Sequence, residues 1–174
     1  MDNERLKPIN LVRFVPVSLA ILVVSGIGLA FVHEIGHGIV CNWGESNTYF
    51  EFAVSITGGG EGRCVGYTGN VDFYRAAGGL LASTVALGIA FGMTATSKKQ
   101  FWLSGNVKPA LPIALICLGF GHLLAATLET FAFDFYLGSQ VAMYLIQTLI
   151  FSTLVIATIM LHRSRAKLVE HRHQ

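Results

Sequence analysis

The motif of this chain that most clearly predicts chemistry is His33-Glu34-Ile35-Gly36-His37. In a helix, residues at positions i and i+4 lie on one face, so both imidazoles can reach a single metal ion. The pattern is typical of zinc sites in which the glutamate takes a proton from zinc-bound water. We therefore predict that His33 and His37 bind Zn²⁺ and that Glu34 is the catalytic general base.

The position of this motif at the end of an uncharged stretch adds weight to the prediction. Residues Phe14 to Val32 carry no charge and lead directly into His33. An ionisable side chain in a membrane helix costs about 3 kcal/mol on insertion scales, and a bound metal ion offsets such a cost. The alternative is solvation at the membrane surface, because His33 lies ~28 Å from Phe14 along a helix and the hydrocarbon core is ~30 Å thick. Solvation explains the polarity of the motif but not its spacing.

A third protein ligand must come from elsewhere, because a catalytic zinc ion usually takes three protein ligands and one water molecule. The candidates are His122, Glu129 and Asp134, which lie within or just after the third apolar stretch. His122 has a second interpretation as a residue that packs between helices or supports a ligand by a hydrogen bond.

Depth in the membrane ranks these candidates. His33 lies 17 residues after Pro16, and Glu129 lies 17 residues after Pro112. Since both helices run in the same direction, the two side chains reach the same depth at ~1.5 Å per residue. His122 falls ~10 Å short of that depth, and Asp134 lies ~7 Å beyond it. We predict Glu129 as the third ligand, and Asp134 remains the alternative if the helix tilts or unwinds.

The composition predicts that these helices cross a membrane. The chain has 174 residues, of which 53% are hydrophobic and 13% are charged, with a mean hydropathy of +0.59. A soluble domain carries about 25% charged residues. Residues 1–174 are expected to form one domain in the lipid bilayer, and the basic residues flank apolar stretches, which argues against a nucleic-acid partner. The predicted transmembrane helices cover about 14–41, 74–97, 109–133 and 137–162.

The segment between the first two helices is the only long one outside the membrane. Two runs rich in aromatic and β-branched residues flank Gly58 to Gly62, a pattern that predicts a β-hairpin at about 48–68 rather than a loop without fixed pairing. The predicted fold class is thus an α-helical polytopic membrane protein with about four transmembrane helices and a small β-hairpin between the first and the second.

The distribution of Lys and Arg predicts the orientation. Of the 12 basic residues, all except Arg63 and Arg75 flank the helices on one side. The positive-inside rule then places both termini in the cytoplasm. Cys41 and Cys64 fall on the opposite side, where they either form a disulfide or remain two free thiols.

With these elements in order, the chain resembles the site-2 protease family of intramembrane zinc metalloproteases. Residues His33 to Gly38 match the family's HExGH helix, and the hairpin falls where the family has a short β element. Residues Ala76 to Ser83 are similar to a Gly-Pro-x-x-Asn motif, with Gly79 and Ser83 at the Gly and Asn positions. Leu80 replaces the proline, and the Leu-Asp-Gly of the family's third-ligand helix is absent.

The resemblance implies a zinc metalloendopeptidase that cleaves transmembrane or membrane-associated protein substrates. Gly79 and Ser83 would then contact the substrate, and an edge strand of the hairpin could hold it by strand addition. Gly78, Gly79, Ala82 and Ser83 also suit close helix packing, which we expect in either case.

Two other functions compete with proteolysis. Some metal transporters carry an HExPH-like motif in a membrane helix, but Gly36 stands at the proline position here. A non-catalytic binding or scaffold protein of the same fold is favoured by the departures near Gly79. The intact Glu34 argues against it, since a scaffold has no physical need for that carboxylate.

Overall fold

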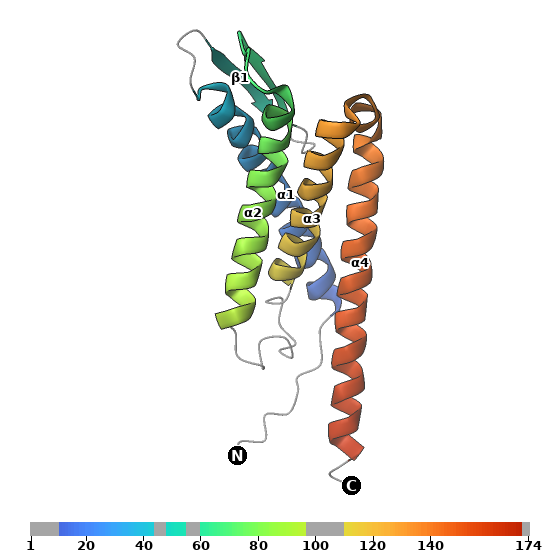
Figure 1. Ribbon diagram of the computed structural model, residues 1–174. Helices are drawn as coiled ribbons and strands as arrows, with labels where there is room; N and C mark the ends of the chain where they lie inside the picture. The colour runs from blue at the N-terminus through green and yellow to red at the C-terminus, as the bar shows by residue number, and fades with distance from the viewer. Residues whose placement is uncertain (1–10, 44–47, 55–59, 97–109, 172–174) are drawn as a thin grey trace.

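The computed structural model describes residues 11–43, 48–54, 60–96 and 110–171. Four long helices and a two-stranded antiparallel hairpin between the first two confirm the predicted fold class (Figure 1). The elements in chain order are α1 (Leu11–Cys41), β1 (Tyr49–Val54), β2 (Gly60–Val65), α2 (Val71–Thr96), α3 (Ala110–Phe131) and α4 (Phe133–His171). Of the predicted glycine turn at Gly58 to Gly62, residues 58 and 59 lie outside the described residues, and residues 60–62 already belong to β2. The predicted helix ends at 97 and 109 also lie outside the described residues.

All four helices are long and apolar enough to cross a bilayer, which points to a multi-pass membrane protein. A helix satisfies its own backbone hydrogen bonds, as lipid requires. The helix α1 begins and α4 ends at one end of the molecule, and the hairpin lies at the other end (Figure 1). The candidate spans are Phe14–Cys41, Val71–Thr96, Ala110–Phe131 and Phe133–Leu161.

The helix α2 begins at Val71, three residues before the predicted start, because a cap precedes it. The Asn70 side-chain oxygen accepts a hydrogen bond from the Phe73 backbone N–H at 3.0 Å. Asp72 in the first turn also favours a helix start at this point.

The helix α4 begins at Phe133 rather than 137, because the chain reverses at Ala132 alone. The Ala132 N–H donates to the Leu128 carbonyl at 2.8 Å, and the Tyr136 N–H donates to the Ala132 carbonyl at 2.9 Å. The helix continues to His171 instead of 162, since residues 162–171 contain neither glycine nor proline. The tight turn brings the start of α4 close to Glu129.

Glycines allow α1, α2 and α3 to pack closely. A Cβ atom on Gly36 would lie 2.6 Å from the Ala77 carbonyl oxygen and 2.8 Å from the Gly78 Cα. A Cβ on Gly79 would meet the His122 carbonyl oxygen and the Ala126 side chain, both on α3. The predicted packing role of these α2 glycines is confirmed, and it places α2 against the part of α1 that carries the motif.

The hydrophobic core lies toward the other end of the bundle. It joins residues of α1, α2 and α3 to Phe151, Val155 and Ile159 of α4. Among the pairs of described elements, α4 comes close to the backbone of α3 alone. The buried side chains of this cluster from the first three helices are Phe14, Leu22, Leu29, Ala86, Ala90, Ile113, Ala114, Leu115, Cys117 and Leu118.

A disulfide between Cys41 and Cys64 fixes the hairpin to the end of α1. It joins residues 23 positions apart with a Cα–Cα distance of 5.7 Å. Of the two alternatives left by the sequence, a disulfide or two free thiols, the structure has the disulfide. In the hairpin register Cys64 faces Phe50, whose ring lies 3.1 Å from the position of a Cβ on Gly38. The hairpin is therefore held against the same stretch of α1 as the motif.

Candidate metal centre

The two histidines of the motif meet Glu129 in the interior of the helix bundle. The Nε2 atoms of His33 and His37 lie 3.0 Å apart. The Glu129 carboxylate lies 3.3 Å from His33 Nε2 and 3.5 Å from His37 Nε2, through one oxygen each. All three residues are buried and together form a group that could bind a metal ion.

The distances within this group fit a tetrahedral metal ion. Bonds of about 2.0–2.1 Å at tetrahedral angles separate the ligand atoms by about 3.3–3.4 Å. The three observed separations of 3.0, 3.3 and 3.5 Å bracket that value. The two separations from Glu129 run to different carboxylate oxygens, so both oxygens lie on the side of the group where an ion would bind.

A hydrogen bond to the backbone of α2 fixes the tautomer of His37. Its Nδ1 lies 2.8 Å from the Tyr74 carbonyl oxygen, which can only accept a hydrogen bond. Nδ1 therefore carries the proton, and in the neutral ring the Nε2 lone pair points at His33 and Glu129. The Tyr74 hydroxyl forms a hydrogen bond with the backbone of Cys64, so Tyr74 joins the centre to β2.

His122 supports the other histidine. Its Nδ1 lies 3.3 Å from Nδ1 of His33, so one ring donates a hydrogen bond to the other. If His33 is the donor, its Nε2 is left with a lone pair toward His37, as the metal group requires. His122 lies beside His33 and is not itself in the three-residue group, and its supporting role stays a prediction.

The Glu34 carboxylate is buried beside this group and faces the hairpin. Its Oε2 occupies the space where a Cβ on Gly62 of β2 would lie, and the Phe50 ring borders the same space. Within the described parts of the chain, this oxygen has no hydrogen-bond partner. A buried carboxylate in that state is costly, so its retention favours a chemical role.

The other predicted site residues lie outside the group. Asp134 is exposed in the first turn of α4. Gly79 packs on α3, and Ser83 is buried one turn further along α2. The substrate contacts expected of Gly79 and Ser83 stay a prediction.

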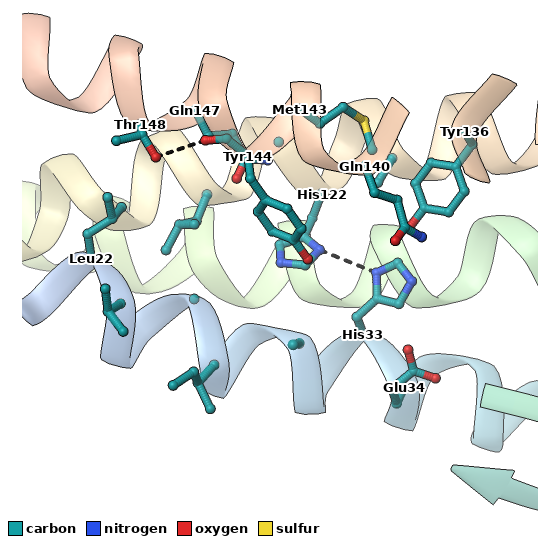
Figure 2. A pocket seen from close by; sticks show the side chains of 17 residues that line it. Leu22, His33, Glu34, His122, Tyr136, Gln140, Met143, Tyr144, Gln147 and Thr148 are labelled. Carbon is teal, nitrogen blue, oxygen red and sulfur yellow. Dashed lines mark hydrogen bonds between the residues drawn. The ribbon is translucent and has the colours of Figure 1, made fainter. Parts of the chain in front are cut away.

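A cavity of about 260 Å³ adjoins the centre between α1, α3 and α4. His33, Glu34 and His122 line one end of it (Figure 2). Tyr136 also lines it, and its hydroxyl forms a hydrogen bond with the Glu129 carboxylate. The sequence reasoning missed Tyr136 and the polar residues that follow it on α4, although their spacing of three or four residues in an apolar helix was a signal.

Comparisons of the chain with protein-family models, curated proteins and solved structures found no match. The functional interpretation therefore depends on the geometry of the metal centre. The likeness to the site-2 protease family remains an expectation from the motif and the order of elements.

Proposed function

We propose that this protein is an intramembrane zinc metalloendopeptidase, related to the site-2 proteases, that hydrolyses peptide bonds of transmembrane or membrane-associated proteins. In this proposal His33, His37 and Glu129 bind Zn²⁺ and Glu34 is the general base. The observation that carries it is the convergence of three buried ligand residues beside the buried Glu34 carboxylate, whose Oε2 has no hydrogen-bond partner among the described residues. Two histidines and a glutamate are also a known ligand set of catalytic zinc.

In this proposal, three residues beside the ligands have separate roles in peptide-bond hydrolysis. Glu34 accepts a proton from the attacking water, whose oxygen adds to the scissile carbonyl carbon. The same carboxyl group then gives the proton to the amide nitrogen as the C–N bond breaks. The Tyr74 carbonyl holds the His37 ring, and His122 holds the His33 ring. When bound, zinc supplies Lewis acidity to water and to the carbonyl.

Elemental mass spectrometry of detergent-purified protein tests the ligand set. We expect close to one zinc per chain in the wild type and loss of zinc in His37→Ala and Glu129→Ala. Asp134→Ala is the matched control, because that carboxylate lies outside the group, and it should keep its zinc. A wild-type protein that holds no metal after zinc is offered would show that the three residues do not form a zinc site in the folded protein.

The Glu34→Gln variant tests catalysis separately from metal binding. It should keep zinc and lose at least about 100-fold in the cleavage rate of membrane-inserted peptides, as expected for a lost general base. Undiminished cleavage by this variant would rule out the proposed mechanism. A wild type that binds zinc and cleaves no peptide of a broad panel would favour the scaffold alternative.

We also propose that both termini face the cytoplasm. The Cys41–Cys64 disulfide supports this, because such bonds persist in oxidising compartments outside the cytosol. A membrane-impermeant maleimide applied to intact cells should label Trp43→Cys at the hairpin end but not Ser164→Cys near the end of α4. Labelling of Ser164→Cys but not of Trp43→Cys would show the opposite topology, with the termini outside the cytoplasm.

A further inference from the structure

The cavity beside the metal centre is long and narrow. Along α1 it extends from Glu34 to Leu22, and along α4 from Tyr136 to Thr148. Each interval is 12 residues, which corresponds to ~18 Å of helix. Its volume of about 260 Å³ is below the ~300–1,000 Å³ of most ligand pockets, so an occupant of that length must be thin.

The two sides of this cavity differ in chemistry. Away from His33, Glu34 and His122, the walls from α1 and α3 are apolar. They include four small residues: Gly26, Ala30, Gly121 and Ala125. The wall from α4 is polar and carries Tyr136, Gln140, Tyr144 and Gln147, which are spaced by four, four and three residues on one helix face. Tyr136, Gln140 and Tyr144 project from α4 toward the helix that carries His33 (Figure 2).

Polar side chains at this depth suit an occupant with a polar backbone. An extended peptide inside a membrane has unpaired N–H and C=O groups, and each needs a partner. A glutamine side chain both donates and accepts hydrogen bonds, so it can pair with both backbone groups. A lipid chain would gain nothing from Gln140 and would leave its amide unpaired.

We propose that this cavity is a substrate subsite that binds about five residues of extended peptide on one side of the scissile bond, at ~3.3 Å per residue. Gln140 pairs with the peptide backbone. The four small residues opposite make room for the peptide backbone, and the small volume of the cavity leaves space for small side chains only, so the subsite selects a run of Gly, Ala or Ser. The inference rests on the proposed function, since Glu34 and the metal group at one end define the scissile bond.

Cross-linking in liposomes tests the subsite without cleavage. The protein carries Glu34→Gln and Cys117→Ala, with one new cysteine at Ala30→Cys in the cavity. The matched control is Gly28→Cys. This position is two residues before Ala30, about 3 Å along the helix axis at ~1.5 Å per residue, and a Cβ there meets nothing within 4 Å. The probe is a lysine-flanked Leu/Ala transmembrane peptide with a central Gly-Ala-Cys-Ala-Gly segment, compared with a Leu-Phe-Cys-Phe-Leu version.

We expect an oxidative cross-link at Ala30→Cys with the small-residue probe, and little with the bulky probe or at Gly28→Cys. Gln140→Leu should reduce the cross-link about tenfold, as for a lost buried hydrogen bond. Tyr144→Phe is a second variant, used if Gln140→Leu fails to fold in thermal unfolding.

Two results would overturn the inference. Equal cross-linking at both positions would mean that the peptide lies outside the cavity. Labelling of Ala30→Cys by a charged methanethiosulfonate, unchanged by the peptide, would identify a water path instead. Absence of zinc binding or of cleavage would refute the proposed function. The cross-linking experiment is separate from both, because the Glu34→Gln chain binds peptide without cleaving it.

Discussion

The helix frame formed by α1, α2 and α3 differs sharply from α4 in how it is packed. In the most apolar window of each helix, the buried share of residues is 56% in α3, 33% in α2 and 22% in α1, against 17% in α4, so burial alone separates α3 clearly from α4. Glycines seat α2 on both α1 and α3, whereas the backbone of α4 comes close to that of α3 alone among the described elements. The three residues of the metal group all come from the tight frame.

The difference in packing suggests different roles: the frame of α1, α2 and α3 holds the three residues of the group in position, and α4 forms a wall of the cavity. A metal site needs ligands fixed to within tenths of an ångström, and close backbone packing provides that rigidity. The helix α4 packs near its start through Tyr136 and at its middle through the cluster around Phe151, and it borders the cavity between them. If α4 moves to admit a peptide, as the proposed subsite requires, this packing would leave His33, His37 and Glu129 in place.

The largest expected effect comes from the disulfide that completes the frame. Cys64→Ser removes a bond that closes a 23-residue separation, and such bonds contribute about 2–4 kcal/mol to the free energy of unfolding. Thermal unfolding in detergent should show the loss. Cys117→Ala is the control, because this buried thiol is not part of any disulfide. An unchanged midpoint for Cys64→Ser would mean that the hairpin does not stabilise α1.

The crossing of α1 and α2 gives the next effect. Gly36→Ala would push a Cβ into the backbone of Ala77 and Gly78, which cannot rotate away, at a cost of about 1–3 kcal/mol. Gly28→Ala on the same helix meets nothing within 4 Å and should be neutral or stabilising by up to about 1 kcal/mol. Metal-free unfolding curves compare the two variants. Equal stability of the two variants would show that the backbones of α1 and α2 lie farther apart at Gly36 than in the structure.

Much of this frame could be predicted from the sequence. Hydropathy gave the four spans, because lipid imposes a minimum apolar length. The equal intervals from Pro16 to His33 and from Pro112 to Glu129 placed both side chains at one depth, and they do meet. This worked because both helices are straight enough for residue number to measure height.

The rest depended on rotation and backbone position, which residue counting does not provide. The His37 partner is a backbone carbonyl, that of Tyr74, and every residue type has one. The one-residue turn at Ala132 carries no glycine or proline, so the sequence offered no signal for it. The sequence shows a polar face on α4 but not which helix it faces, so its position across the cavity from His33 could not be predicted.

Tyr136 is the point where α4 reaches the metal centre. Tyr136→Phe removes the hydroxyl bonded to Glu129 and should weaken zinc binding about 10–100-fold, as for other residues that orient a ligand. Competition with a chelator measures the affinity. Tyr144→Phe, two turns along the same face, should leave the affinity unchanged. An equal loss in both variants would mean that the α4 face acts through packing and not through this hydrogen bond.

The smallest effect concerns the contact that ties the start of α4 to α2. The Arg75 guanidinium lies 4.3 Å from the centre of the Phe133 ring, a cation–π pair worth about 0.5–1 kcal/mol. A double-mutant cycle with Arg75→Gln and Phe133→Leu should give a coupling energy of that size in thermal unfolding. Arg75→Lys should keep part of it, since the charge remains. A coupling energy of zero would mean that this pair does not hold the start of α4 to α2, and that, among the described residues, α4 is attached to the other helices only through α3 and the cluster around Phe151.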